Sequence, residues 1–230
     1  MQPLVEISND LSQFLQSVHH IRKIGKGTFL YQEGLPANEV FIIQSGKIKI
    51  SKITPDGREL TLRLCSTGEL IGELSMFCPA SKYLLNAKVI ESGEVAVIYK
   101  DELERRLEID SRLAIEFMRW ESNQNRKMQT KFRDLVLHGK KGAVCSTLIR
   151  LTNSYGQKTP NGILIDLPLT NQELANFCGT SREVVNRMLS DLRKNHVLSV
   201  DKGIITIHDL NYLKMEINCE NCPKEICNIE

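Results

Sequence analysis

Residues 170–194 read TNQELANFCGTSREVVNRMLSDLRK. Thr170 and Glu173 form the pattern of a capping box, in which two residues satisfy free backbone N–H groups at the start of a helix. This pattern predicts a helix over about 171–177. The CysGlyThr triplet at 178–180 predicts a tight turn after it, because glycine adopts positive φ without steric cost.

A second helix is expected over 182–194, with Ser181 as its N-cap. At about 100° per residue, its apolar side chains gather on one side, where they can pack on the rest of a domain. Its polar side chains gather on the other, with Arg182 on the flank. Two helices joined by a short glycine-containing turn are typical of a helix-turn-helix.

The polar side of this second helix carries groups that match the edges of DNA bases. An Arg can bridge O6 and N7 of guanine, and a Glu can accept from N4 of cytosine. A solvated surface helix would also carry charges, but the capped helix and glycine turn before it favour DNA recognition. The residues predicted to contact DNA are Thr180, Ser181, Arg182, Glu183, Asn186 and Arg187.

The surroundings of this motif support the same interpretation. Two β-branched runs, at 197–200 and 204–207, predict a hairpin of the kind that forms the wing of a winged helix. Residues 119–210 carry 14 Lys/Arg against 8 Asp/Glu, whereas the whole chain has a net charge of only +2. A basic segment alone is a weak pointer to nucleic acid. Lys140 is a candidate phosphate contact within it.

Residues 25–99 have a different composition and hold eight of the 14 glycines. Short β-branched runs alternate there with turn signals such as Ser45-Gly46 and Ser92-Gly93, which predicts an antiparallel sandwich or barrel. A short helix is expected before it, over about 9–18. The expected strands are 28–31, 40–43, 47–50, 60–64 and 95–98.

Residues 110–138 contain neither Pro nor Gly and predict one long helix, capped by Asp110 or Ser111. At ~1.5 Å per residue it is longer than a small domain needs. Such a helix bridges domains or pairs with a partner chain, although it could also pack on the β region. We expect a homodimer, because otherwise a long apolar stripe would stay exposed. The stripe comprises Leu113, Phe117, Trp120, Met128, Phe132 and Leu135.

The seven cysteines fall into two groups. Four are scattered among apolar neighbours and are expected to be small buried residues: Cys65, Cys78, Cys145 and Cys178. The other three lie within the last twelve residues as Cys219-x2-Cys222-x4-Cys227. This clustering predicts a metal or redox site.

The glycine-punctuated β region, the long helix and the ThrSerArgGluValValAsnArgMetLeu motif together resemble the Crp/Fnr family of transcription regulators over nearly the whole chain. The resemblance implies an α+β fold. Its expected parts are an N-terminal double-stranded β-helix of the cyclic-nucleotide-binding jelly-roll type (1–109), a dimerisation helix (110–139), a winged helix-turn-helix (140–210) and a cysteine-containing tail (211–230).

The resemblance also implies partners. It implies a homodimer that binds a palindromic site in double-stranded DNA, with TGTGA-like half-sites, beside promoters where RNA polymerase acts. The family's Arg-Glu-x3-Arg pattern assigns base contacts to Arg182, Glu183 and Arg187.

The tail CysGluAsnCysProLysGluIleCys is similar to that of Bacillus-type Fnr regulators. This implies an oxygen-labile [4Fe-4S] cluster on Cys219, Cys222 and Cys227. Three ligands leave one open, and the resemblance points to Asp134 as the fourth, with His138 as the runner-up. Spacing alone leaves a 3Fe–4S cluster or zinc open. Asp134 could also be a solvated residue paired with Lys131 or His138.

A second possible input is a nucleotide. Gly68-x3-Gly72-Glu73-Leu74 resembles the first half of the phosphate cassette of cyclic-nucleotide-binding relatives. Where that cassette has Arg followed by Ser or Thr, the chain has Lys82-Tyr83-Leu84. Lys cannot bind a phosphate bidentately and Tyr fills space that a nucleotide needs, so nucleotide binding is not expected.

Other function classes find little support. The sequence offers no nucleophile–base pair, Walker loop or HExxH motif, so we do not expect an enzyme. It has no apolar run of membrane-spanning length and no signal-peptide pattern, so a cytoplasmic protein is expected. Two functions remain: a redox-responsive DNA-binding regulator of the anaerobic response, and a Crp-type regulator controlled by a small effector or partner protein, with a structural zinc tail.

Overall fold

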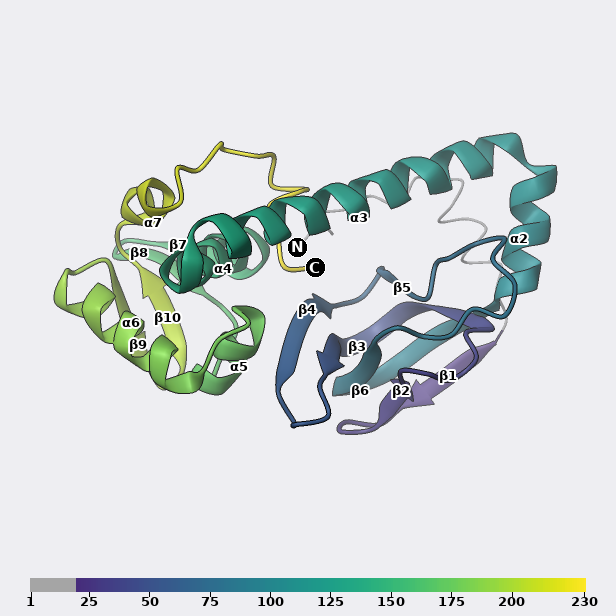
Figure 1. The fold of residues 1–230 in the computed structure, drawn as a ribbon, viewed down its shortest axis with the longest axis horizontal. Helices are drawn as coiled ribbons and strands as arrows, with labels where there is room; N and C mark the ends of the chain where they lie inside the picture. Colours follow the sequence, from purple (N-terminus) through teal and green to yellow (C-terminus); the bar gives the residue numbers. More distant parts are fainter. Residues whose placement is uncertain (1–19) are drawn as a thin grey trace. The chain divides into compact units, whose positions relative to one another are not determined.

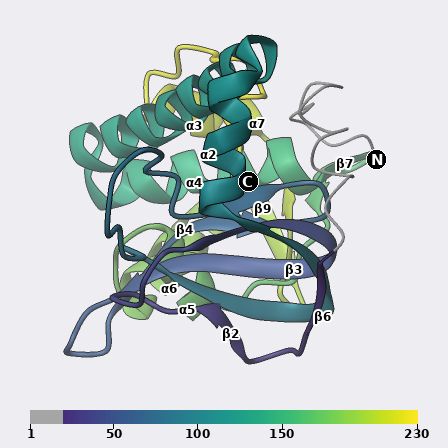
Figure 2. The same ribbon diagram turned by 90° about the vertical axis from the view of Figure 1, so that its right-hand side faces the viewer.

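Two long antiparallel strands, β3 (Glu39–Ile53) and β6 (Asn86–Tyr99), form the centre of the N-terminal sheet (Figures 1 and 2). The structure is a computed structural model that describes residues 20–230, so the helix expected over about 9–18 lies outside the described residues. The sheet order is β1-β6-β3-β4, with β2 on β6 and β5 on β3. The shorter strands are β1 (Ile21–Ile24), β2 (Phe29–Tyr31), β4 (Glu59–Cys65) and β5 (Leu70–Gly72).

The glycine pairs expected as turns lie inside these long strands. Ser45-Gly46 interrupts β3 opposite Ser92-Gly93 in β6, and the register shifts there. A Cβ on Gly93 would lie 2.0 Å from the carbonyl oxygen of Ser45. The two runs expected at 40–43 and 47–50 are therefore one bulged strand, because glycine allows a close backbone approach as well as a turn.

The sheet buries apolar residues on both faces, which confirms the expected α+β fold. The inner face packs around Phe41, Ile43 and Ile48. The outer face packs against two helices, α2 (Lys100–Ile109) and the first half of α3 (Ser111–Leu137). Helix α2 was not predicted from the sequence.

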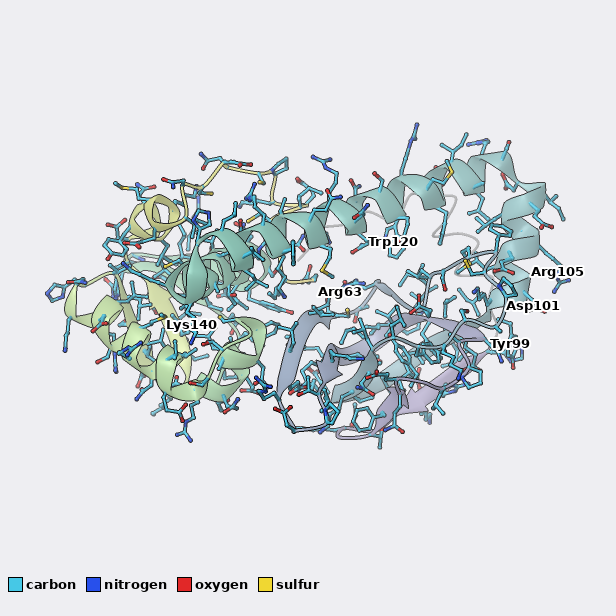
Figure 3. The ribbon with its side chains drawn as sticks, in the orientation of Figure 1. Arg63, Tyr99, Asp101, Arg105, Trp120 and Lys140 are labelled. Carbon is cyan, nitrogen blue, oxygen red and sulfur yellow. The ribbon has the colours of Figure 1, made fainter. Side chains whose placement is uncertain are left out.

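The first half of α3 contributes its apolar residues to this second core. Phe117 and Trp120 are buried, and Trp120 points from α3 toward the sheet (Figure 3). The expectation that both would be exposed without a partner chain is therefore wrong, because strands β3 and β6 already cover them. Asp110 caps the helix as expected, since its Oδ1 accepts from the backbone N–H groups of Arg112 and Leu113 at 3.0 and 3.1 Å.

A different apolar face of α3 is exposed. Ile115, Met118, Met128, Phe132 and Val136 are all exposed in the chain as described. At about 100° per residue, Met118, Phe132 and Val136 lie within about 40° of one another around the helix. The exposed apolar residues therefore share one side of α3 and are not scattered around it.

The C-terminal part contains a helical bundle and a second sheet of order β7-β8-β10-β9 (Figure 1). The chain divides near the middle of α3: apart from Arg58–Thr61 and Glu230, residues up to Asn123 form one compact unit and Gln124–Ile229 form the other. In the described part of the chain, none of the helices has the length and apolar character needed to cross a membrane. The C-terminal elements are α4 (Gly139–Tyr155), β7 (Gly156–Thr159), β8 (Gly162–Ile165), α5 (Asn171–Phe177), α6 (Arg182–Lys194), β9 (Leu198–Asp201), β10 (Ile204–Ile207) and α7 (Leu210–Glu216).

Three of the four scattered cysteines are buried, as expected: Cys65, Cys145 and Cys178. Cys78 is exposed, so the expectation of burial is wrong for this residue. It lies in an irregular loop after β5, and its carbonyl accepts from the buried ammonium of Lys100 at 3.3 Å.

Candidate functional site

The helix-turn-helix forms as its local sequence predicts. The hydroxyl of Thr170 accepts from the backbone N–H of Glu173, and the Glu173 carboxylate accepts from the backbone N–H of Thr170 at 2.8 Å. Gly179 in the turn has φ +58°, a conformation that glycine adopts without strain. Ser181 caps α6 by accepting from the backbone N–H of Val184. The capping contacts fix where both helices begin.

The inner side of α6 holds it in the domain, and the outer side is free for a ligand. Val185, Leu189 and Leu192 are buried. The predicted base-contacting residues Arg182, Glu183, Asn186 and Arg187 are all exposed. The structure therefore brings four of the six predicted DNA contacts together on one exposed face.

The hydroxyl groups of the other two predicted contacts differ in this state. The hydroxyl of Ser181 is engaged as the helix cap. The hydroxyl oxygen of Thr180 is buried and has no hydrogen-bond partner among the described residues. Hydrogen bonds from its own backbone N–H and from Ser181 hold the pKa of Glu183 below its ordinary value.

The wing and α4 complete this face. Strands β9 and β10 pair around the turn at Lys202, as the sequence predicts. The imidazole of His208 lies 2.9 Å from the hydroxyl of Ser199 and 2.6 Å from the carbonyl of Asn161, which ties the wing to the loop before β8. Lys140, the candidate phosphate contact, is exposed at the start of α4 (Figure 3).

Asp134, the carboxylate that the resemblance indicates as a ligand, is buried in α3 rather than solvated. Its Oδ2 accepts from Ser146 at 2.7 Å and from Arg150 at 3.0 Å. Its Oδ1 accepts from Nε and Nη2 of Arg133 at 3.1 and 2.9 Å. Burial acts to raise the pKa of Asp134, but the hydrogen bonds from Ser146, Arg150 and Arg133 hold it below its ordinary value. Its charged partners are two arginines, Arg133 and Arg150, where the sequence suggested Lys131 or His138.

Helix α4 connects Asp134 to the cysteine tail. The guanidinium of Arg150 also donates to the carbonyl of Ile226 at 3.3 Å. Asn153 donates to the carbonyl of Cys227 at 2.6 Å, and Ser154 accepts from the backbone N–H of Ile229 at 3.0 Å. These residues were not predicted from the sequence. A signal was present, since Ser146, Arg150, Asn153 and Ser154 follow helical spacing within this helix.

The three tail cysteines carry free thiols and share a charged neighbourhood with Asp134. Burial raises the pKa of Cys227, Arg150 lowers it, and the charges of Cys219, Cys222 and Asp134 raise it again. Among the residues that the structure describes, no three His, Cys, Asp or Glu side chains are close enough to hold a metal ion in this state. The donor set of three thiols and a carboxylate fits an iron–sulfur cluster in its chemistry, provided that Asp134 gives up a present partner.

The N-terminal region of strands β1–β6, called the β roll below, offers little room for a nucleotide. Tyr83 is buried, stacks on Tyr31 with ring centroids 4.1 Å apart, and donates its hydroxyl to the carbonyl of Glu39 at 2.8 Å. Lys82 is exposed. The two residues that replace the Arg and hydroxyl of the phosphate cassette therefore fill the interior or point into solvent.

Comparisons with known proteins agree with this architecture. Residues 21–110 match the cyclic nucleotide-binding domain, and residues 142–216 match the Crp-like helix-turn-helix domain. The chain is 54% identical over 225 residues to the "Anaerobic regulatory protein" of Bacillus subtilis, covering 97% of this chain and 94% of that protein. It is 32% identical to the "Lactate racemization regulatory protein" of Lactiplantibacillus plantarum, covering 86% and 92%. Among solved structures, FixK2 from Bradyrhizobium japonicum is similar with a TM-score of 0.72 at 19% identity, covering 89% of this chain and 98% of that one, a likeness of fold.

An exposed recognition helix beside a wing, preceded by a β roll and a long helix, defines a DNA-binding transcription regulator and not an enzyme. The chain belongs to the Crp/Fnr family.

Proposed function

We propose that this chain is a homodimeric regulator of the anaerobic response that senses oxygen through an iron–sulfur cluster. Cys219, Cys222 and Cys227 would hold the cluster, with Asp134 as the fourth ligand. When bound, the cluster supplies the oxygen-sensitive chemistry. The observation that carries the proposal is the convergence of the cysteine tail on Asp134 through α4, in the same unit as the recognition helix.

The similarity to an anaerobic regulatory protein over nearly the whole chain supports this proposal. The same proposal has the dimer act in the cytoplasm, bind palindromic DNA with TGTGA-like half-sites about one helical turn apart, and work with RNA polymerase. Arg182, Glu183, Asn186 and Arg187 would contact base edges, with Thr180 and Ser181 at the start of the helix.

In this proposal, the tail influences DNA binding through α4 and α7. Glu216, at the end of α7, pairs with Lys141 at 2.7 Å at the start of α4, three residues before Cys219. Helix α4 in turn packs against α5, α6 and α7. Drawing the cysteines together at Asp134 would shift this group of helices, and a ligand that prefers one arrangement changes DNA affinity by that difference.

We expect the exposed face of α3 to form the dimer interface, because Met118 and Phe132 are 64% and 65% exposed on one side of the helix. Replacing Phe132 with Glu should shift the protein to monomer in sedimentation velocity, since it buries a charge in the interface. Arg126→Glu, about 120° round the helix from Phe132, serves as the control. Wild-type protein that sediments as a monomer at all concentrations would contradict the dimer.

Anaerobic purification followed by an absorbance spectrum and an iron and sulfide assay tests the function. The proposal expects iron and sulfide at a cluster's stoichiometry and a visible band that air bleaches. Zinc without sulfide would instead favour a regulator controlled by a small effector or partner, with a structural zinc tail.

A further inference from the structure

All the acceptor capacity of the Asp134 carboxylate is in use. Arg133 donates twice to Oδ1, and Ser146 and Arg150 each donate once to Oδ2. A carboxylate has about four lone-pair sites, so this group has none left for a metal. Asp134 can serve as a ligand only if one of these donors leaves.

The two arginines differ in how firmly they are held. Arg150 is 2% exposed and binds Thr130, Ser146 and the carbonyl of Ile226 as well as Asp134. If it left Asp134, a buried cation would remain without its anion, which is costly. Arg133 is 30% exposed, so its guanidinium can return to water at little cost.

Arg133 also faces the cysteines. Its Nη1 donates to Glu220 at 2.5 Å, and Glu220 stands between Cys219 and Cys222 in the sequence. One guanidinium therefore bridges the candidate ligand oxygen and the segment that carries two candidate thiols. The positive charge of Arg133 therefore lies between Asp134 and the segment that carries Cys219 and Cys222.

We propose that Arg133 is an exchangeable cover on Oδ1 of Asp134, which leaves this oxygen when Asp134 becomes a ligand, while Arg150 keeps its bond to Oδ2. This inference rests on the proposed function, in which Asp134 and the cysteines form one site. In the cluster-free protein, Arg133 neutralises Asp134 and holds Glu220 against α3. Arg133 is thus a regulatory residue that sets how readily the site is loaded, and Arg150 is a positioning residue.

The test uses the full-length, metal-free protein under anaerobic conditions, with Co²⁺ alone as the probe and its thiolate charge-transfer absorption as the signal. Arg133→Gln should tighten Co²⁺ binding about fivefold, the effect of releasing one partly exposed ion pair. Arg150→Gln should weaken binding about tenfold or more, as loss of a residue that orients a metal ligand does. Arg126→Gln removes the same charge from an exposed position of α3 and should leave the affinity unchanged.

A double-mutant cycle assigns the effect to Asp134. In an Asp134→Asn background, Arg133→Gln should no longer change Co²⁺ affinity, because the covered carboxylate is gone. If Arg133→Gln binds Co²⁺ as the wild type does while Cys222→Ser has lost binding, the cover is wrong and the cysteine site stands. If Cys222→Ser binds Co²⁺ like the wild type, the cysteine site itself is wrong, and the role of Arg133 falls with it.

Discussion

Cys222→Ser is expected to abolish the iron–sulfur cluster and, with it, the difference between anaerobic and aerobic DNA affinity. A serine hydroxyl stays protonated at neutral pH and does not replace a thiolate as an iron ligand. Cys222 lies between the other two tail cysteines in sequence, so its loss leaves no Cys-x2-Cys pair. The measurement is the iron and sulfide content of anaerobically prepared protein, together with DNA binding before and after exposure to air.

Cys78→Ser is the matched control for this variant. Cys78 is the one exposed thiol among the four scattered cysteines, and it lies in the N-terminal unit. It should keep both the cluster and the oxygen response. If Cys219→Ser, Cys222→Ser and Cys227→Ser all retain wild-type iron content and oxygen response, the tail is not the sensor. A regulator controlled by a small effector or partner protein, with a structural zinc tail, would then be the preferred function.

Arg187→Ala should weaken binding to the specific DNA site by about 1–3 kcal/mol and relax the preference for one guanine. Arg187 is exposed on α6 beside Glu183 and Asn186. Under the proposed function, its guanidinium would donate to O6 and N7 of a guanine in the major groove. The helix itself should be unaffected, because the buried side of α6 is unchanged. Titrations against the palindromic site, single-base variants of it and random DNA measure the effect.

Lys140→Ala provides the comparison for Arg187→Ala. Lys140 is exposed at the start of α4, and a Lys–phosphate contact carries no sequence information. Its loss should weaken binding to specific and random DNA alike and lower the slope of log affinity against log salt by about one. Equal losses on specific and random DNA for Arg187→Ala would show that Arg187 does not contact a base.

The helix-turn-helix could be predicted from sequence because its determinants are local. Thr170 and Glu173 are three residues apart, Gly179 follows them closely, and Ser181 caps the next helix. Each contact joins residues within one or two turns, so the sequence order places them together. The exposed polar face of α6 follows from the same helical period.

The neighbours of the cysteine tail could not be predicted in this way. The partners of Asp134 include Ser146 and Arg150 on another helix, and Arg150 reaches a carbonyl 76 residues further along the chain. Helical period shows which residues of α4 share a face, but not which element packs against that face. The sequence therefore suggested a solvated Asp134 or a ligand, whereas the structure has a buried carboxylate held by two arginines.

The sequence by itself determined the order of the β roll, long helix and winged helix, and the exposed groups of the recognition helix, since these depend on local pattern. Only the tertiary structure decided which apolar face of α3 is covered: Phe117 and Trp120 pack on β3 and β6, and Met118 and Phe132 remain exposed. It also decided that Ser45-Gly46 and Ser92-Gly93 meet as a bulge within the sheet. In both cases the outcome depends on which distant segment fills the space beside a residue, and burial against that segment supplies the stabilising free energy.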